Sequence, residues 1–176
     1  MTRTIPIFGS VDDLLLKIMR DFFVDHPEIH IGSLYASGLQ PPIIIVRRER
    51  RSGQASIDST DDRFIQPAIV SVNTITSGPD ADQLGEEIQE ACRIAIREAQ
   101  QNQVTYPGLG SISAITNSVE PSRVADWATS TGQVQYASLP KGWTRFESVY
   151  RLLIRPPDQV LVHNRYVSNR NTPPSQ

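Results

Sequence analysis

The sequence predicts an α+β domain: a mostly antiparallel four-stranded sheet with two helices packed on one face, a long hairpin loop and a C-terminal arm. Residues 11–22 and 81–100 place apolar side chains at helical spacing. Four other segments have the continuous or alternating apolar pattern of strands: residues 43–46, 66–75, 111–119 and 144–154. The order helix, strand, strand, helix, strand, strand predicts one sheet that both helices cover.

The first helix is marked at both ends. Ser10 is a favourable N-cap, with Asp13 at the capping-box position three residues later. Its apolar stripe consists of Val11, Leu14, Leu15, Ile18, Met19 and Phe22. Because Pro27 disfavours helical geometry in the residue before it, we expect the helix to end by about residue 24 or 25. Residues 26–42 contain glycines and paired prolines, which predicts an irregular connection.

The first two strands flank the predicted hairpin loop. Residues 43–46 are four successive β-branched residues, which predicts a strand that is buried on both faces and continues into the following arginines. The charged and small polar residues from there to Asp62 predict the loop. In the second strand Pro67 lies near the start, where proline is tolerated. One face of that strand is predicted to hold Ala68, Val70, Val72 and Thr74.

A strand-to-helix junction follows at residues 77–80. Asp80 is expected to cap the second helix, with Gln83 three residues on. The apolar side of this helix is predicted to hold Leu84, Ile88, Ala91, Cys92, Ala95 and Ala99. Pro156-Pro157 predicts the end of the last strand, so we expect a single domain over residues 1–156 and an extended or loosely ordered arm over residues 157–176.

Composition limits the function classes. The chain has 176 residues and a formal net charge of −2, so it lacks the basic excess typical of general nucleic-acid binders. Cys92 is the only cysteine, which excludes an intrachain disulfide and a thiolate metal site. No segment has the pattern of a secretory signal or the roughly 20 apolar residues that span a bilayer. We therefore expect no membrane contact.

No set of residues predicts catalysis. His26 and His30 lie four residues apart, but Pro27 disrupts the helix that a metal site with this spacing needs. The glycines after Tyr106 follow a helix rather than a strand, so they predict a turn and not a phosphate-binding loop. No serine and histidine are arranged as a nucleophile with its base. We expect no enzyme activity, no cofactor and no metal.

Six residues are candidates for an interaction surface: Arg47, Arg48, Arg50, Arg51, Trp127 and Trp143. The four arginines surround one glutamate, a local excess of three positive charges that could contact phosphates or an acidic protein surface. The alternative is a solvated loop that nearby aspartates neutralise. Each tryptophan flanks the polar stretch between the last two strands, where it could anchor an interface or cover the end of the core.

Three stretches follow one another in a recognisable order and spacing. They are VDDLLL (residues 11–16), AIVSVN running through GPDAD into LGEEI (residues 68–88), and TRFESVYRLLIRP (residues 144–156). In this arrangement the chain resembles the tail terminator proteins of long-tailed bacteriophages, small subunits that cap the tail tube and join it to the head. The resemblance covers most of residues 10–156 and excludes residues 51–62 and the tail after Pro157.

The resemblance implies a structural virion protein without catalysis or cofactor. It implies a ring, usually a homo-hexamer, with the tail-tube protein on one face and a head-completion (stopper) protein on the other. DNA passes through the lumen without sequence-specific binding. The ring ends tail elongation at the head-tail junction of a virion assembled in the host cytoplasm. Because a lumen that passes DNA must not hold phosphates tightly, the arginines are expected at a subunit or tube contact.

The sequence leaves other functions open. Another head-tail connector component, such as a head-closure (stopper) or tail-tube protein, would also form rings but with different end partners. A non-phage adaptor domain would be monomeric or would bind a defined peptide. An enzyme or a nucleic-acid-processing accessory protein would need a clustered acidic or histidine site.

Overall fold

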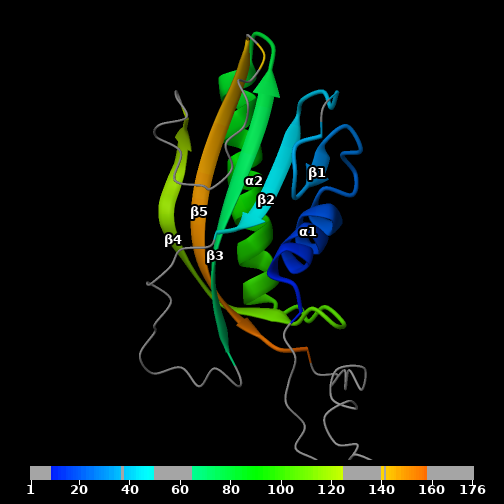
Figure 1. Ribbon diagram of the computed structural model, residues 1–176, viewed down its shortest axis with the longest axis vertical. Coiled ribbons are helices and arrows are strands. Elements are labelled where there is room, and N and C mark those ends of the chain that lie inside the picture. The colour runs from blue at the N-terminus through cyan, green and yellow to red at the C-terminus, as the bar shows by residue number, and fades with distance from the viewer. Residues whose placement is uncertain (1–8, 37, 50–64, 125–139, 141, 158–176) are drawn as a thin grey trace, which may run out of the picture.

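The computed structural model describes residues 9–36, 38–49, 65–124, 140 and 142–157 (Figure 1). These residues form two helices and five strands: α1 (Val11–Phe22), β1 (His30–Gly32), β2 (Ile43–Arg48), β3 (Gln66–Ser77), α2 (Ala81–Gln101), β4 (Ser111–Arg123) and β5 (Trp143–Arg155). The α+β class agrees with the prediction from the sequence. The predicted arm, apart from Pro157, and most of the predicted hairpin loop lie outside the described residues.

The prediction of a four-stranded, mostly antiparallel sheet is wrong. In the described part of the chain the sheet has five strands, in the order β1-β2-β3-β5-β4, and it is mixed. The additional strand is β1, which pairs parallel with β2, with His30 opposite Ile43. A three-residue strand that ends in Gly32 is too short to show an apolar repeat, so its sequence resembles a loop. Its pairing is continued by the His30 amide, which donates to the Pro42 carbonyl at 3.0 Å.

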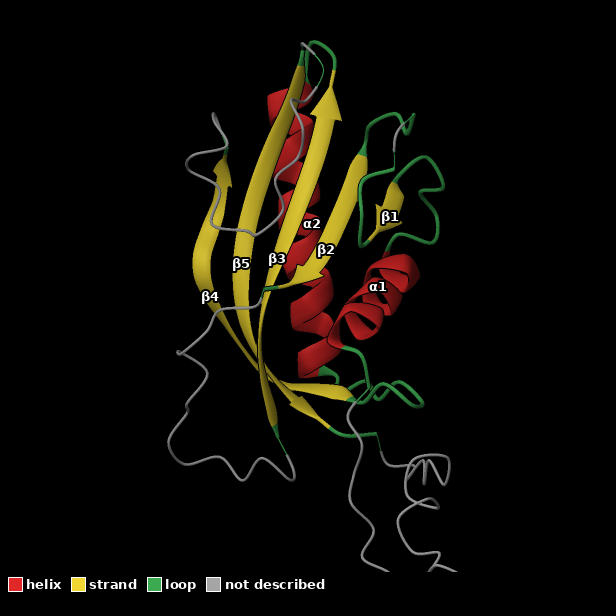
Figure 2. Cartoon of the chain, viewed as in Figure 1, coloured by secondary structure: helices red, strands yellow, loops and turns green. Residues whose placement is uncertain are grey.

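Both helices pack on the same face of the sheet (Figure 2). The Asp13 amide donates to the Ser10 side chain at 3.2 Å, which confirms the predicted N-cap of α1. Apolar residues of α1, α2 and the helix-facing side of the strands form one core, and Leu14, Val70 and Tyr150 are fully buried in it. Cys92 also lies in this core, as its place on the apolar stripe predicted.

The buried side of α2 differs from the predicted one. Leu84 is 36% exposed, while Gly85 and Gln89 face the sheet and are buried. The helix rests so closely on β5 at Gly85 that an added Cβ would lie 2.5 Å from the Phe146 ring. A glycine and a glutamine thus occupy the centre of the packing face, and neither has the apolar character that periodicity detects. Asp80 is the N-cap residue of α2, as expected, but its side chain makes no capping hydrogen bond.

The middle of the sheet is a long antiparallel pair. Strands β3 and β5 pair over twelve residues, from Gln66 opposite Ile154 to Ser77 opposite Trp143. Strand β4 extends to Arg123, four residues beyond the predicted end, and its register with β5 shifts at three places. The two central strands therefore form the base on which α2 packs.

Candidate functional site

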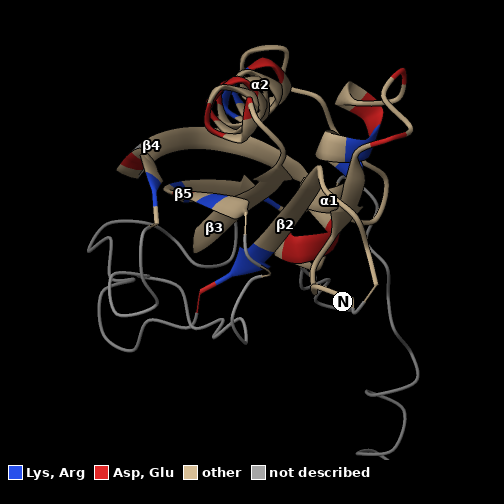
Figure 3. Cartoon of the chain, turned by 90° about the horizontal axis from the view of Figure 1, so that it is seen from above, with Lys and Arg blue, Asp and Glu red and all other residues tan. Residues whose placement is uncertain are grey.

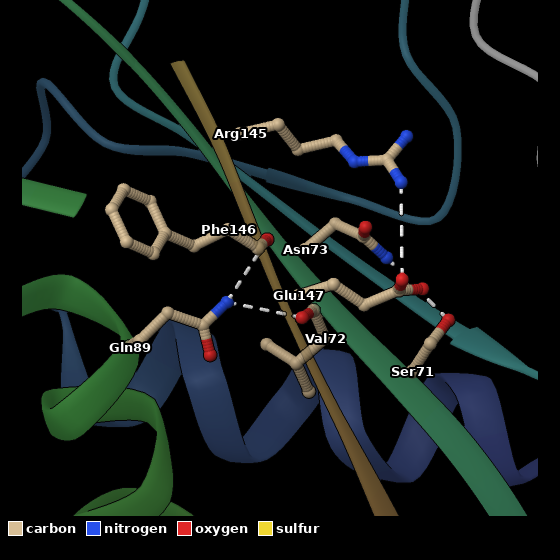
Figure 4. Close-up of polar contacts among 7 residues, drawn as sticks. All are labelled: Ser71, Val72, Asn73, Gln89, Arg145, Phe146 and Glu147. Carbon is tan, nitrogen blue, oxygen red and sulfur yellow. Dashed lines mark hydrogen bonds and ion pairs between the residues drawn. The ribbon is translucent and has the colours of Figure 1, made fainter. Parts of the chain in front are cut away.

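The sheet face opposite the helices carries a cluster of polar side chains. We call Ser71, Asn73, Arg145 and Glu147 the polar sheet face (Figure 4). Their positions follow from the alternation of β3 and β5, since Asn73 lies directly opposite Glu147 in the register. Alternation predicts the charged residues of β5 on this side, but all four polar side chains are also buried.

The centre of the polar sheet face is a buried ion pair. The Arg145 Nη2 atom lies 3.8 Å from the Glu147 Oε2 atom, and the two residues are 6% and 4% exposed. Beside it, the Asn73 amide donates to the Ser71 hydroxyl at 3.5 Å. Buried charges require partners because an isolated one loses its hydration. The sheet therefore holds these two side chains in a fixed, mutually compensating arrangement.

Gln89 provides a second buried polar arrangement, on the helix side of the same strands (Figure 4). Its Nε2 atom donates to the Val72 carbonyl at 3.1 Å and to the Phe146 carbonyl at 3.3 Å. Its Oε1 atom accepts a hydrogen bond from the Ser148 hydroxyl at 2.8 Å. One amide thus joins α2 to both central strands. A glutamine between Ile88 and Cys92, within an apolar stripe, is the sequence signal that could have located it.

Replacing Gln89 with leucine is expected to destabilise the fold by about 1–3 kcal/mol, because the Ser148 hydroxyl and the two carbonyls lose a buried partner. Urea unfolding measures the effect. The matched control is Gln83→Leu, the same substitution at an exposed position of the same helix, for which a change within about 0.5 kcal/mol is expected. Equal effects at the two positions would show that the three hydrogen bonds contribute nothing.

The structure separates the predicted arginine cluster. Arg47 and Arg48 lie on opposite faces at the end of β2, since neighbouring strand residues alternate. Arg47 is half-buried opposite Ser71, on the side of the polar sheet face. Arg48 is exposed, and its backbone amide donates to the Asp12 carboxylate at 2.6 Å. The other two arginines of the cluster, at positions 50 and 51, lie outside the described residues.

Trp143 is half-buried at the start of β5. Its ring meets Tyr35 edge to face, with centroids 6.3 Å apart, and packs against a small apolar cluster on the face opposite the helices. That cluster consists of Ile43, Ile45 and Ile75. The position fits the interpretation that this tryptophan covers the end of a core. Trp127 lies outside the described residues.

The outer side of α2 is acidic in its first half, and we call this surface the acidic helix face. It consists of Asp82, Glu86, Glu87 and Glu90, all exposed. Asp82 pairs with Arg123, at 2.8 Å between Oδ2 and Nη1, and Glu90 pairs with Arg93. In the part of the chain that the structure describes, the other two carboxylates have no cationic partner.

Of the other side chains with reactive or titratable groups, Cys92 and Tyr150 are buried in the core and His26 is exposed. Burial raises the pKa of the Cys92 thiol far above its ordinary value, so this cysteine stays protonated. Burial also raises the pKa of Tyr150 to about 12. His26 Nδ1 lies 3.1 Å from Glu28 Oε1 in an exposed pair. Among residues 9–36, 38–49, 65–124, 140 and 142–157, no three histidine, cysteine or acidic side chains are grouped to hold a metal ion.

Comparisons with known proteins do not assign the chain to a family. No family model and no curated protein matches it. None of the helices in the described ranges is both long enough and apolar enough to cross a membrane.

Proposed function

We propose that this chain is a structural subunit of a long-tailed bacteriophage, a tail terminator that forms a ring on the end of the tail tube. The supporting observation is where the resemblance falls in the fold. Its three stretches correspond to α1, to β3 with the start of α2, and to β5. Residues of these four elements pack in one core, in which Leu14, Ile88 and Tyr150 are buried (Figure 2). The resemblance thus concerns the framework of the domain rather than separate loops.

In this role the protein acts through shape and contact, and the proposal includes no catalytic step, cofactor or metal. The paired β3 and β5 strands, braced by α2, supply a stiff subunit. Its charged surfaces meet neighbouring subunits, the last ring of the tail-tube protein and the head-completion protein. The DNA passes through the lumen, and the protein resides in the virion at the head-tail junction after assembly in the host cytoplasm.

The first test is assembly of the purified protein. Mass photometry of the 19.6 kDa chain, with and without tail tubes of the virus that encodes it, is expected to show a ring, with a homo-hexamer the expected size. Negative-stain images are expected to show added density at one end of each tube. Rings that form only on tubes would give the same end density, since a tube end can serve as template.

A second measurement separates a terminator from the other connector proteins. When the protein is added during tube polymerisation, tubes are expected to stop growing, so their lengths fall as the protein concentration rises. Heat-unfolded protein is the control, because it retains composition and charge but not the surfaces. A folded monomer that leaves tube ends bare and tube lengths unchanged would overturn the proposal and favour the adaptor alternative. Incorporation along the tube would favour a tube protein.

A further inference from the structure

The exposed side of α2 is an acidic surface without a complete set of cationic partners among the described residues. Between residues 78 and 92 the chain has five acidic residues and no lysine or arginine. Glu86 and Glu87 are exposed, and no cation of a described residue lies against them. Leu84, 36% exposed on the same helix, adds an apolar side chain to this side. The rim of a protein interface is polar and solvent-accessible, so exposed carboxylates suit such a rim.

The end of β2 carries the opposite charge. The side chains of Arg47 and Arg48 make no hydrogen bond or ion pair with other residues that the structure describes. Figure 3 shows α2 and this end of β2 well apart in the molecule. Arg47 lies on the face opposite the helices, whereas Arg48 lies on the helix-facing side, where its backbone amide contacts Asp12 of α1. Neither arginine pairs with a carboxylate of the acidic helix face in its own chain. Two separate surfaces of opposite sign, each without a full set of partners among the described residues, are complementary between copies.

We propose that the end of β2 of one copy docks on the acidic helix face of the next copy, with Arg47 and Arg48 of the first against Glu86 and Glu87 of the second. The contact is head to tail, since it joins two different surfaces. Repeated around a closing rotation, such a heterologous contact generates a ring. The inference rests on the proposed ring and names the surfaces that build it.

The ion pairs of this contact are expected to be weak and sensitive to salt. Exposed ion pairs contribute roughly 0–1 kcal/mol each, so these charges select the partner and its orientation more than they hold it. The screening length shrinks from about 10 Å at 0.1 M salt to about 3 Å at 1 M. Ring formation should therefore weaken at high salt. The exposed Leu84, one helical turn before Glu87, contributes the part of the contact that salt does not screen.

Charge reversal tests the contact in the full chain. The variant Glu86→Lys with Glu87→Lys and the variant Arg47→Glu with Arg48→Glu are each expected to assemble at least tenfold more weakly than the wild type. In an equimolar mixture every contact regains opposite charges, because a copy with two basic surfaces alternates with a copy with two acidic ones. Assembly within threefold of the wild type is expected. With one variant isotopically labelled, native mass spectrometry should find equal numbers of each in the ring.

The matched control is Asp25→Lys with Glu28→Lys, the same change of charge at exposed positions after α1. It is expected to assemble as the wild type does. Arg48→Glu alone changes an exposed position, so it still tests the contact if the double arginine variant fails to fold. Thermal unfolding of every variant shows which are folded. Where rings form only on tubes, occupancy of tube ends replaces ring mass as the readout.

The outcomes distinguish a failure of this proposed contact from a failure of the proposed function. Wild-type rings together with unimpaired charge-reversed variants would overturn this contact and leave the ring intact. The same holds for impaired variants whose mixture does not recover, since direct pairing requires recovery. A wild-type chain that forms no ring, alone or on tubes, would remove the proposed function and this contact with it.

Discussion

Replacing Gly110 with alanine is expected to lower the free energy of unfolding by about 2–6 kcal/mol. Gly110 has a φ of +101°, and a Cβ added there would lie 2.1 Å from the Arg155 carbonyl oxygen. Backbone strain in such a conformation costs roughly 1–3 kcal/mol, and overlap with packed atoms adds roughly 1–3. The obstacle is backbone at the end of β5, so no side-chain rotation relieves it. Urea unfolding measures the loss.

Gly78→Ala separates the two causes of this loss. Gly78 has a nearly identical φ of +103°, but nothing lies within 4 Å of its added Cβ. Its replacement should therefore cost only the strain, roughly 1–3 kcal/mol. If both variants lose the same stability, the close approach of Gly110 to Arg155 has no energetic weight. The β4–β5 end would then be looser than the structure indicates.

The ion pair on the polar sheet face gives the second large effect. Arg145→Met should cost about 3–5 kcal/mol, because it removes the cation that lies 3.8 Å from the 4%-exposed Glu147 carboxylate. Glu147→Leu should cost a similar amount for the opposite reason. The double variant is expected to recover most of the loss, since apolar residues of similar volume often replace a buried pair at little cost.

A double-mutant cycle measures the coupling directly, by urea unfolding of the wild type, both single variants and the double variant. A coupling energy of at least about 2 kcal/mol is expected, because each single variant leaves a buried charge that the double variant does not contain. Strictly additive losses would mean that the two side chains, 3.8 Å apart, are stabilised by other groups.

Local patterns in the sequence predict most of the fold. Residues 43–46 are buried on both faces, as four successive β-branched residues indicate, and Ser10 caps α1. The boundaries of α2 differ from the prediction by one residue. These features depend on neighbours within a few positions along the chain, so periodicity and capping rules are sufficient to locate them.

The features that sequence patterns missed depend on distant contacts. Strand β1 is defined by its parallel pairing with β2, and its three residues are too few to show an apolar repeat. Alternation places Glu147 on the correct face, yet cannot show that the face is buried. The partners of Gln89 lie 17 and 57 residues away in sequence. For the candidate surfaces, alternation could have shown that Arg47 and Arg48 diverge, but how far these arginines lie from the acidic side of α2 required the fold.

The twelve-residue pairing of β3 with β5 has a mechanical consequence. Antiparallel ladder hydrogen bonds lie perpendicular to the strands, so a pull along the strand axis loads many of them at once in shear. A pull across the strands would instead open them one after another, as in peeling. The Gln89 amide, which binds a carbonyl of each strand, resists sliding between them. The subunit should therefore be stiff along β3 and β5 and softer across them, so its orientation in an assembly decides how much load it can bear.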